Sequence, residues 1–261
     1  MIKVINQTNI FFWNFAHFMF ECLFPEINLN LHNEDLIMRK NSVDQTLGIY
    51  LKLYEEIMGV KVIEVSEKEF SEFPAPLRIV KSNTKPSLEE FDNFRNYMFS
   101  KFPIKISPRY APILLIQRGC NKTQAESLDI SEDQSKTGYE SREIKDIEIL
   151  KSFLKENYPA NHECIVLEEM PIQQQMEYFV NAKIIIGAHG AGLSNTLFCQ
   201  PETCVIEVDC VDATGGSLAK NWEHFRTIST ALKLKHLLCP DDLDQIKKAL
   251  EIEFNARIAL W

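Results

Sequence analysis

The sequence predicts an α/β fold in which helices cover both faces of a parallel sheet. Short apolar runs typical of buried strands alternate with segments whose apolar residues recur at helical spacing; the clearest runs are 113–117, 184–186 and 204–208. Strands that alternate with helices form βαβ units, whose strands lie parallel. With 45% hydrophobic residues, the chain of 261 residues has enough apolar content for a sizeable core.

A cluster of prolines divides the chain into two halves. Pro103, Pro108 and Pro112 follow one another closely, and such spacing is typical of a linker or a domain boundary. We therefore expect one domain over residues 1–107 and a second over 108–240. An amphipathic helix over 241–261 could then pack back across the domains, onto the N-terminal one.

The first half is expected to alternate strands with helices. Pro25 should end the first helix or follow its last turn, because proline cannot continue a regular helix. Gly59 is expected to cap the second helix. The predicted strands are 3–5, 60–65 and 77–80, and the predicted helices are 11–24, 47–58 and 88–102.

The second half shows the alternation more plainly. Residues 120–139 have little apolar periodicity and are expected to form a loop. The predicted strands are 113–117, 164–167, a run from Ile184, and 204–208. The predicted helices are 144–158, one around 176–180, one from about Leu193, 222–234, and one from 243 onward.

Composition limits the classes of protein to which the chain belongs. A formal charge of −9 argues against general affinity for nucleic acid, which needs a basic surface. Seven cysteines without paired spacing suggest neither a disulfide framework nor a zinc site, so a reducing compartment is expected. The aromatic run 10–24 is too short to span a bilayer, and no signal peptide is evident. We expect a soluble cytoplasmic protein of undetermined oligomeric state.

The most informative stretch is Gly-Ala-His-Gly-Ala-Gly-Leu-Ser-Asn-Thr-Leu-Phe at 187–198. It follows an apolar run and precedes a predicted helix, whose first N–H groups would suit a phosphate. The glycine spacing, G-x-x-G-x-G, differs from the dinucleotide fingerprint. One reading is a tight turn in which the glycines serve backbone geometry alone; His189, a titratable ring within the turn, favours a functional reading.

Polar residues follow three of the predicted strands, where ligands bind in parallel α/β sheets. Arg118 follows one strand, His189 a second, and Glu207 lies at the end of the third. Arg118, and Arg142 at the start of its helix, are suited to phosphate oxygens, and Glu207 to ribose hydroxyls. Each residue alone could be an ordinary surface group, but their coincidence at one sheet edge predicts a nucleotide-diphosphate pocket. The predicted pocket residues are Arg118, Arg142, His189, Gly190, Ala191, Gly192, Ser194, Asn195 and Glu207.

A polar stripe on the first predicted helix is a candidate for acid–base chemistry. His17 and Glu21 are spaced by one helical turn on an otherwise apolar segment that also carries Asn14. Glu21 could act as a general base with His17 as its partner. Two alternatives stay open: a core histidine with satisfied hydrogen bonds, or half of a metal site without a third ligand.

Residues 187–198, continued by Pro-Glu-Thr-Cys-Val-Ile-Glu-Val at 201–208, closely resemble the signature of glycosyltransferase family 61. This family includes xylosyltransferases, arabinosyltransferases and O-linked N-acetylglucosaminyltransferases. The resemblance covers most of residues 112–240, and His17 to Glu21 with Pro25 resembles a His-x-x-x-Asp…Pro element of the family. Here the acid is Glu instead of Asp, and the segment between Arg118 and Arg142 is longer than usual.

The resemblance implies a GT-B architecture, in which two Rossmann-like domains face each other across a cleft. It also implies an inverting enzyme of polysaccharide or glycan biosynthesis that uses a UDP-sugar, xylose or N-acetylglucosamine, without a divalent metal or other cofactor. Glu21 would then be the general base, assisted by His17. The chain is short for the family and shows no membrane anchor, which suggests a soluble catalytic module from a microbe or a virus.

Two other functions stay open at this stage. One is a different nucleotide-dependent α/β enzyme, such as an oxidoreductase, although the glycine spacing speaks against it. The other is a protein that binds a nucleotide sugar without catalysis. The single Asp-x-Asp sequence, at 242–244, opens the last predicted helix and is read as acids that favour a helix start.

Overall fold

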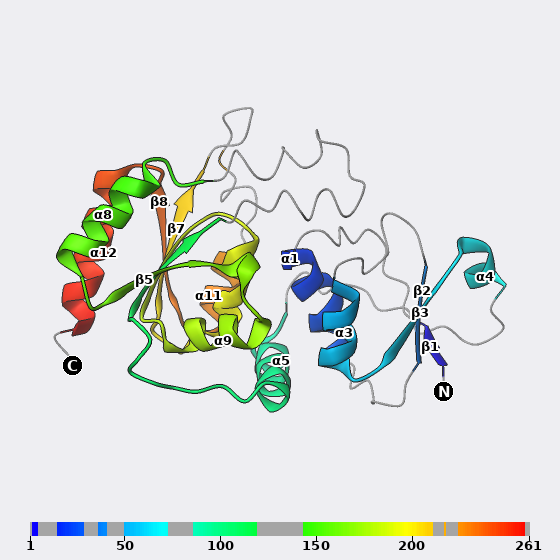
Figure 1. Cartoon of the computed structure of the whole chain (residues 1–261). Coiled ribbons are helices and arrows are strands. Elements are labelled where there is room, and N and C mark those ends of the chain that lie inside the picture. The colour runs from blue at the N-terminus through cyan, green and yellow to red at the C-terminus, as the bar shows by residue number, and fades with distance from the viewer. Residues whose placement is uncertain are drawn as a thin grey trace. The chain divides into compact units, whose positions relative to one another are not determined.

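The structure, a computed structural model, divides the chain into two compact units, Met1–Phe102 and Pro103–Trp261 (Figure 1). The division falls at Pro103, the first proline of the cluster; the domain boundaries expected at 107 and 240 stay predictions. Described residues are 2–4, 15–28, 36–40, 50–72, 86–118, 143–210, 217 and 224–258. The strand expected at 77–80 and the loop expected at 120–139 lie outside these ranges.

The first unit contains a parallel sheet in the order β1-β2-β3. Gly59 follows α3 (Leu51–Met58) in the left-handed conformation, with φ of 64°. Its N–H donates to the carbonyl of Glu55 at 2.9 Å, which confirms the predicted cap. The strands are β1 (Ile2–Val4), β2 (Leu36–Lys40) and β3 (Lys61–Val65); the helices after β2 are α3 (Leu51–Met58), α4 (Glu67–Ser71) and α5 (Leu88–Lys101).

The first helical segment continues beyond Pro25, so the prediction that this proline ends the helix or follows it is wrong. The segment consists of α1 (Phe15–His17), a π-helical stretch η1 (Phe18–Leu23) and α2 (Phe24–Asn28). Pro25 lies in the first turn of α2, where a missing N–H donor costs little. The π-helical stretch just before it changes the regular bonding pattern, so the backbone accommodates the proline ring.

Aromatic side chains join α2 to α5 within this unit. The Phe24 ring lies 5.1 Å from the Phe91 ring and 5.3 Å from the Phe94 ring, and all three side chains are buried. A capping box starts α5: Ser87 Oγ accepts from the Glu90 N–H at 3.2 Å, and Glu90 Oε2 accepts from the Ser87 N–H at 2.7 Å. The predicted helix over 88–102 is therefore confirmed.

The second unit contains a five-stranded parallel sheet in the order β5-β4-β6-β7-β8, which confirms the predicted parallel α/β architecture. If the strands of this sheet are numbered by their order in the chain, their order across the sheet is 2-1-3-4-5. The second strand, β5, lies on one side of β4, and the third, β6, lies on the other side, so the strand order reverses between β4 and β6. Ligands of such sheets bind beyond the carboxyl ends of the strands at this reversal. The strands are β4 (Ile113–Gln117), β5 (His162–Val166), β6 (Ile184–Ala188), β7 (Cys204–Asp209) and β8 (Lys235–Pro240).

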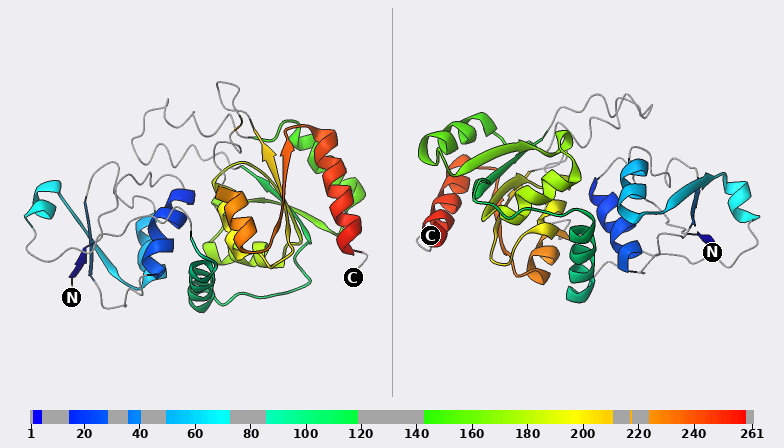
Figure 2. Two further views of the ribbon diagram at one scale, coloured as in Figure 1. Left: turned by 180° about the vertical axis from the view of Figure 1, so that it is seen from behind. Right: turned by 60° about the horizontal axis from the view of Figure 1, so that its bottom comes forward.

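Helices cover both faces of this sheet (Figures 1 and 2). One face packs against α8 (Ile147–Asn157) and α12 (Leu243–Ile258). The other face is covered by α9 (Ile172–Asn181), η4 (Ala191–Phe198) and α11 (His224–Ala231). The short η3 (Leu167–Glu169) lies between β5 and α9 in the chain. Side chains from α8, α12 and alternate residues of the strands form the first of these cores, among them Leu115, Leu150, Ile186, Ile206 and Leu250.

One prediction for this unit needs revision. The helix expected from about Leu193 is a 3₁₀ helix that already begins at Ala191, with the Leu193 N–H bonded to the carbonyl of Gly190 at 3.0 Å. The tighter turn suits a short element beside a strand end. The last helix, α12, buries Ile246 and Leu250 in the core of the second unit; its packing back onto the N-terminal half stays a prediction. None of the described helices is long and apolar enough to cross a bilayer.

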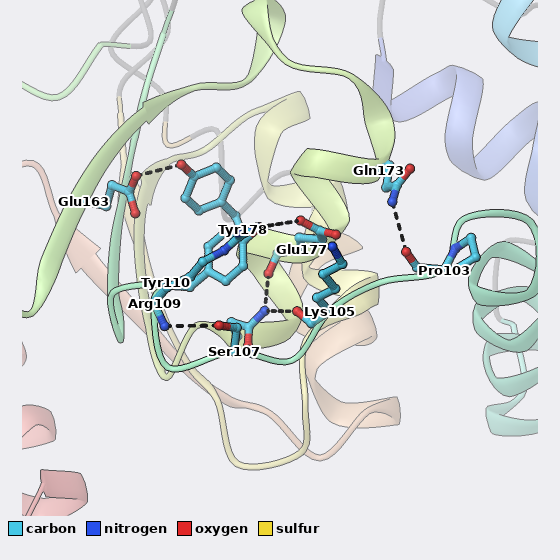
Figure 3. Close-up of polar contacts among 10 residues, drawn as sticks. Pro103, Lys105, Ser107, Arg109, Tyr110, Glu163, Gln173, Glu177 and Tyr178 are labelled. Carbon is cyan, nitrogen blue, oxygen red and sulfur yellow. Dashed lines mark hydrogen bonds and ion pairs between the residues drawn. The ribbon is translucent and has the colours of Figure 1, made fainter.

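The start of the second unit lies along α9 (Figure 3). Gln173 Nε2 donates to the carbonyl of Pro103 at 2.9 Å. At the other end of α9, Asn181 Nδ2 donates to the carbonyl of Lys105 at 2.9 Å, and its Oδ1 accepts from the Ser107 N–H at 2.8 Å. These side chains bind the backbone of residues 103–107 and so fix the chain before it enters β4.

We expect Asn181→Ala to destabilise the second unit by about 1–3 kcal/mol, because it leaves the partly buried Ser107 N–H and the Lys105 carbonyl without this partner. Asn157→Ala is the matched control: Asn157 also ends a helix, but it is exposed and bonds only within its own helix, to Phe153. The control should change stability by less than about 0.5 kcal/mol. Thermal unfolding measures both; equal losses would contradict the anchoring role.

Candidate active site

Arg118 and the glycine-rich turn meet at the reversal of the strand order. Strands β4 and β6 are neighbours, with Ile116 paired to Gly187, so the residues that follow each strand lie side by side. A Cβ atom at Gly190 would lie 2.6 Å from Nη2 of Arg118. The guanidinium therefore lies against the backbone of the turn. The structure thus brings together two of the predicted pocket residues.

Each glycine of the turn permits a close approach of side chains. A Cβ at Gly187 would lie 3.2 Å from the Ile116 side chain, and one at Gly192 would also lie 3.2 Å from it. Gly190 has φ of 165°, an extended conformation that any residue adopts. Glycine is therefore favoured at 190 by the space that Arg118 occupies and not by backbone strain.

His189 is held by three contacts, and only 5% of its surface is exposed. Its backbone N–H donates to the carbonyl of Val208 at 2.9 Å. Its ring nitrogen Nδ1 lies 2.5 Å from Oε1 of Glu207. Its ring also packs edge-on against Phe225, at 5.3 Å between centroids. Backbone and ring together hold this imidazole in one orientation at the carboxyl end of β6.

Glu207 uses both carboxylate oxygens within the protein. Oε1 accepts from His189, and Oε2 lies 2.6 Å from Nε2 of His236 in β8. Only 3% of the Glu207 surface is exposed. Burial favours a higher pKa for this carboxyl, but the hydrogen bonds from His189 and His236 and their electrostatic attraction outweigh it, so the pKa lies below its ordinary 4.5.

His236 is a site residue that the sequence analysis missed. Its strand, β8, was not predicted, because the pattern around it, Lys-His-Leu-Leu-Cys-Pro, alternates too little to indicate a strand. The parallel pairing of β7 with β8 places His236 opposite Val205, within reach of Glu207. The only signal in the sequence was a lone histidine, which by itself indicates nothing.

Ser194 and Asn195 are completely buried in η4. Asn195 Nδ2 donates to Oε1 of Gln175 at 2.9 Å, and Gln175 Nε2 donates to the carbonyls of Leu167 and Met170 at 3.0 Å. Asn195 therefore ties η4 to α9 and to the loop before α9. Within the described part of the chain, the Ser194 hydroxyl has no hydrogen-bond partner. Direct contact of either side chain with a diphosphate stays a prediction.

Three predicted residues cannot be placed in full. Arg142 lies outside the described residues. The backbone of His17 lies in α1 and that of Glu21 in η1, but the side chains of both lie outside the described part of the structure. The described residues contain no group of three or more His, Cys, Asp or Glu side chains that could hold a metal ion.

A separate hollow of about 290 Å³ lies beside α9, lined by Arg109, Tyr110, Pro171, Gln173, Gln174 and Glu177. Its polar groups largely bind one another: the Tyr110 hydroxyl donates to Glu177, and Arg109 Nη2 lies 2.9 Å from that hydroxyl. Arg109 also lies 3.7 Å from Glu177 (Figure 3). Tyr110 precedes β4, whereas Arg118 follows it, so these residues flank opposite ends of the strand.

The arrangement at the carboxyl ends of β4 and β6 is suited to an anion. Arg118 contributes a permanent positive charge and bidentate donors beside a turn without side chains at 190 and 192. His189 adds an imidazole whose Nδ1 is bonded to Glu207, which leaves Nε2 as its other polar atom. Phosphate oxygens fit this set of donors better than a neutral ligand does.

The lowered pKa of Glu207 predicts a pH-dependent contribution to stability. We expect Glu207→Gln to cost about 1–3 kcal/mol near neutral pH, where the carboxylate is ionised and bonded by two imidazoles. Because the pKa of Glu207 is lower in the folded protein than its ordinary value of 4.5, the ionised carboxylate stabilises the fold at pH values above 4.5. This contribution is lost as the pH falls through the lowered pKa.

The difference between wild type and Glu207→Gln should therefore shrink in acid. Denaturant unfolding across pH measures it, with Glu148→Gln as the control, since Glu148 is exposed and its ion pair among the described residues is with Lys151. A difference that stays constant down to the lowest pH at which the protein folds would show that the charge of Glu207 contributes nothing.

Comparison with known proteins assigns the chain to a family. The sequence model of the family Glycosyltransferase 61 matches residues 15–206, more than half of the chain. The match includes Arg118 and the whole glycine-rich turn. Among curated proteins, none matches the chain. The chain belongs to glycosyltransferase family 61, and it is an enzyme that transfers a sugar from a donor to an acceptor.

Proposed function

We propose that this glycosyltransferase is inverting and transfers xylose or N-acetylglucosamine from a UDP-sugar to a glycan hydroxyl. The observation that carries the donor assignment is the contact of Arg118 with the Gly190 backbone at the strand reversal. A nucleotide diphosphate combines negative charge with pairs of phosphate oxygens that the planar guanidinium of an arginine binds in bidentate fashion. The family match supports sugar transfer; the UDP-sugar, with xylose or N-acetylglucosamine, is what the resemblance of residues 187–208 implies.

In this proposal the second unit holds the donor. The diphosphate lies against Arg118 and the backbone of Gly190, Ala191 and Gly192, with His189 beside it. Arg142 supplies a further phosphate contact. Ser194 and Asn195 act through η4, whose fixed position defines the turn. A GT-B arrangement, with the acceptor bound by the first unit, completes the proposed architecture.

The proposed reaction is a single displacement. Glu21 takes the proton from the acceptor hydroxyl, assisted by His17, and the hydroxyl oxygen forms a bond to the anomeric carbon. The bond from that carbon to the diphosphate breaks on the opposite face, and its electron pair leaves with UDP. Arg118 and the donors of the turn stabilise the charge that develops on UDP, and preorganised donors of this kind contribute a few kcal/mol each. We propose that no divalent metal is required.

Nucleotide binding tests the donor site directly. Calorimetric titration with UDP and with GDP, in the presence of a chelator, should give micromolar affinity for UDP. Gly190→Ala should weaken UDP binding about tenfold or more, because the added Cβ displaces the guanidinium of Arg118. Arg118→Ala and His189→Ala should weaken it as well.

Arg109→Ala is the matched control for these variants, since Arg109 flanks the other end of β4 and pairs with Glu177. It should leave UDP affinity unchanged. If wild type binds neither nucleotide, or if Gly190→Ala and Arg118→Ala bind as tightly as wild type, the donor assignment is wrong.

Turnover tests the proposed base. We expect Glu21→Gln to lower kcat by about 10²–10⁴, because a general base contributes a factor of that size, and to leave UDP affinity within about twofold, because the base acts on the acceptor. His17→Ala should lower kcat by a smaller factor. Donor consumption over a panel of sugars and acceptors measures both. Near-full activity in both variants would remove Glu21 and His17 from the mechanism.

A further inference from the structure

We propose that Glu207 and His236 are positioning residues for His189, which they hold with Nδ1 protonated so that Nε2 is the atom presented at the donor turn. This inference rests on the proposed function only for the identity of the ligand. It gives Glu207 a role different from the ribose contact expected from the sequence, and it adds His236 to the site.

The first argument comes from the hydrogen bonds of the carboxylate. Each oxygen of Glu207 already accepts from one imidazole, at 2.5 Å from His189 and 2.6 Å from His236. With 3% of its surface exposed, Glu207 offers a ribose almost no surface. A ribose contact would require at least one of these charge-assisted bonds to break, which is unfavourable for a buried carboxylate.

The second argument concerns the protons. An ionised carboxylate can only accept hydrogen bonds, so the nitrogens that face it must both carry hydrogen. The lowered pKa of Glu207 keeps it ionised at neutral pH. His189 is therefore protonated at Nδ1, and His236 is protonated at Nε2. Fixing one ring nitrogen through a carboxylate is the usual way in which proteins orient the other nitrogen toward a ligand.

The surroundings limit the other groups that could influence this proton. Strand β7 contributes Glu207, β8 contributes His236, and the residue after β4 contributes Arg118, which lies against the neighbouring Gly190. From α11, the described contact with the His189 ring is the apolar Phe225. The carboxylate is thus the one described acid that bonds this imidazole.

Nitrogen NMR of protein labelled with ¹⁵N-histidine tests the arrangement without any ligand. The chain contains six histidines, and the variants His189→Gln and His236→Gln assign the two signals by their loss. With both rings neutral, wild type should show the Nδ1–H form at His189 and the Nε2–H form at His236. The opposite form at His189 would overturn the proposal.

Glu207→Gln makes the test sharper, because a carboxamide presents one oxygen and one NH₂ group. It can accept from only one of the two rings, so the other ring must accept from it and change its protonated nitrogen. We expect at least one histidine to change form, with UDP affinity lowered about tenfold. Unchanged forms at both rings would contradict the proposal.

Glu253→Gln is the matched control, since Glu253 is also a buried carboxylate, 2% exposed, held by Lys235 and Arg257 in the same unit. This variant should leave both histidine forms and UDP affinity unchanged, even where it lowers the melting temperature. A comparable loss of UDP affinity in Glu253→Gln would show that loss of stability alone explains the effect.

Titration with 2′-deoxy-UDP separates positioning from ribose binding. A site that bonds the ribose hydroxyl discriminates strongly against the deoxy analogue. If Glu207 positions His189, the ratio of the two dissociation constants is the same in wild type and Glu207→Gln. If Glu207 binds the ribose, the ratio falls to about one in the variant, and the proposal is wrong. Absence of UDP binding in wild type would overturn the proposed function, while the NMR result would still decide the positioning role.

Discussion

The close contact between the turn after β6 and the end of β4 is the constraint on which the rest of the site depends. Gly187 and Gly192 leave room for Ile116, Gly192 also leaves room for Leu167, and Gly190 leaves room for Arg118. The glycines therefore serve contacts with neighbouring segments as well as the turn itself. A Cβ at Gly190 would displace the Arg118 guanidinium, and a Cβ at Gly187 or Gly192 would press on the Ile116 side chain, at the point where strand order reverses.

A second constraint is the buried charge of Glu207. Burial of an ionised carboxylate is costly unless it is compensated, and here both oxygens receive imidazole donors from the strands on either side of β7. The same bonds that stabilise the charge also fix the ring of His189, whose backbone is already bonded to Val208. Stability and orientation at the site thus come from one set of interactions.

Sequence reasoning succeeded where one segment contains its own signal. The continuous apolar runs of β4, β6 and β7 indicated buried parallel strands, and the helical spacing of apolar residues over 88–102 indicated α5. It failed where the outcome depends on a partner elsewhere. Pro25 continues a helix only because a π-helical stretch precedes it, and His236 approaches Glu207 only because β8 pairs with β7.

The family match covers only part of the candidate site. The match ends at residue 206, after the turn and Arg118 but before Glu207 and His236. Similarity therefore shows the sugar-transfer activity. The carboxylate and the second imidazole enter through the register of β6, β7 and β8. Because a ring orientation depends on its bonded partner and not on its own residue type, the orientation of the His189 ring is fixed by a residue outside the matched segment.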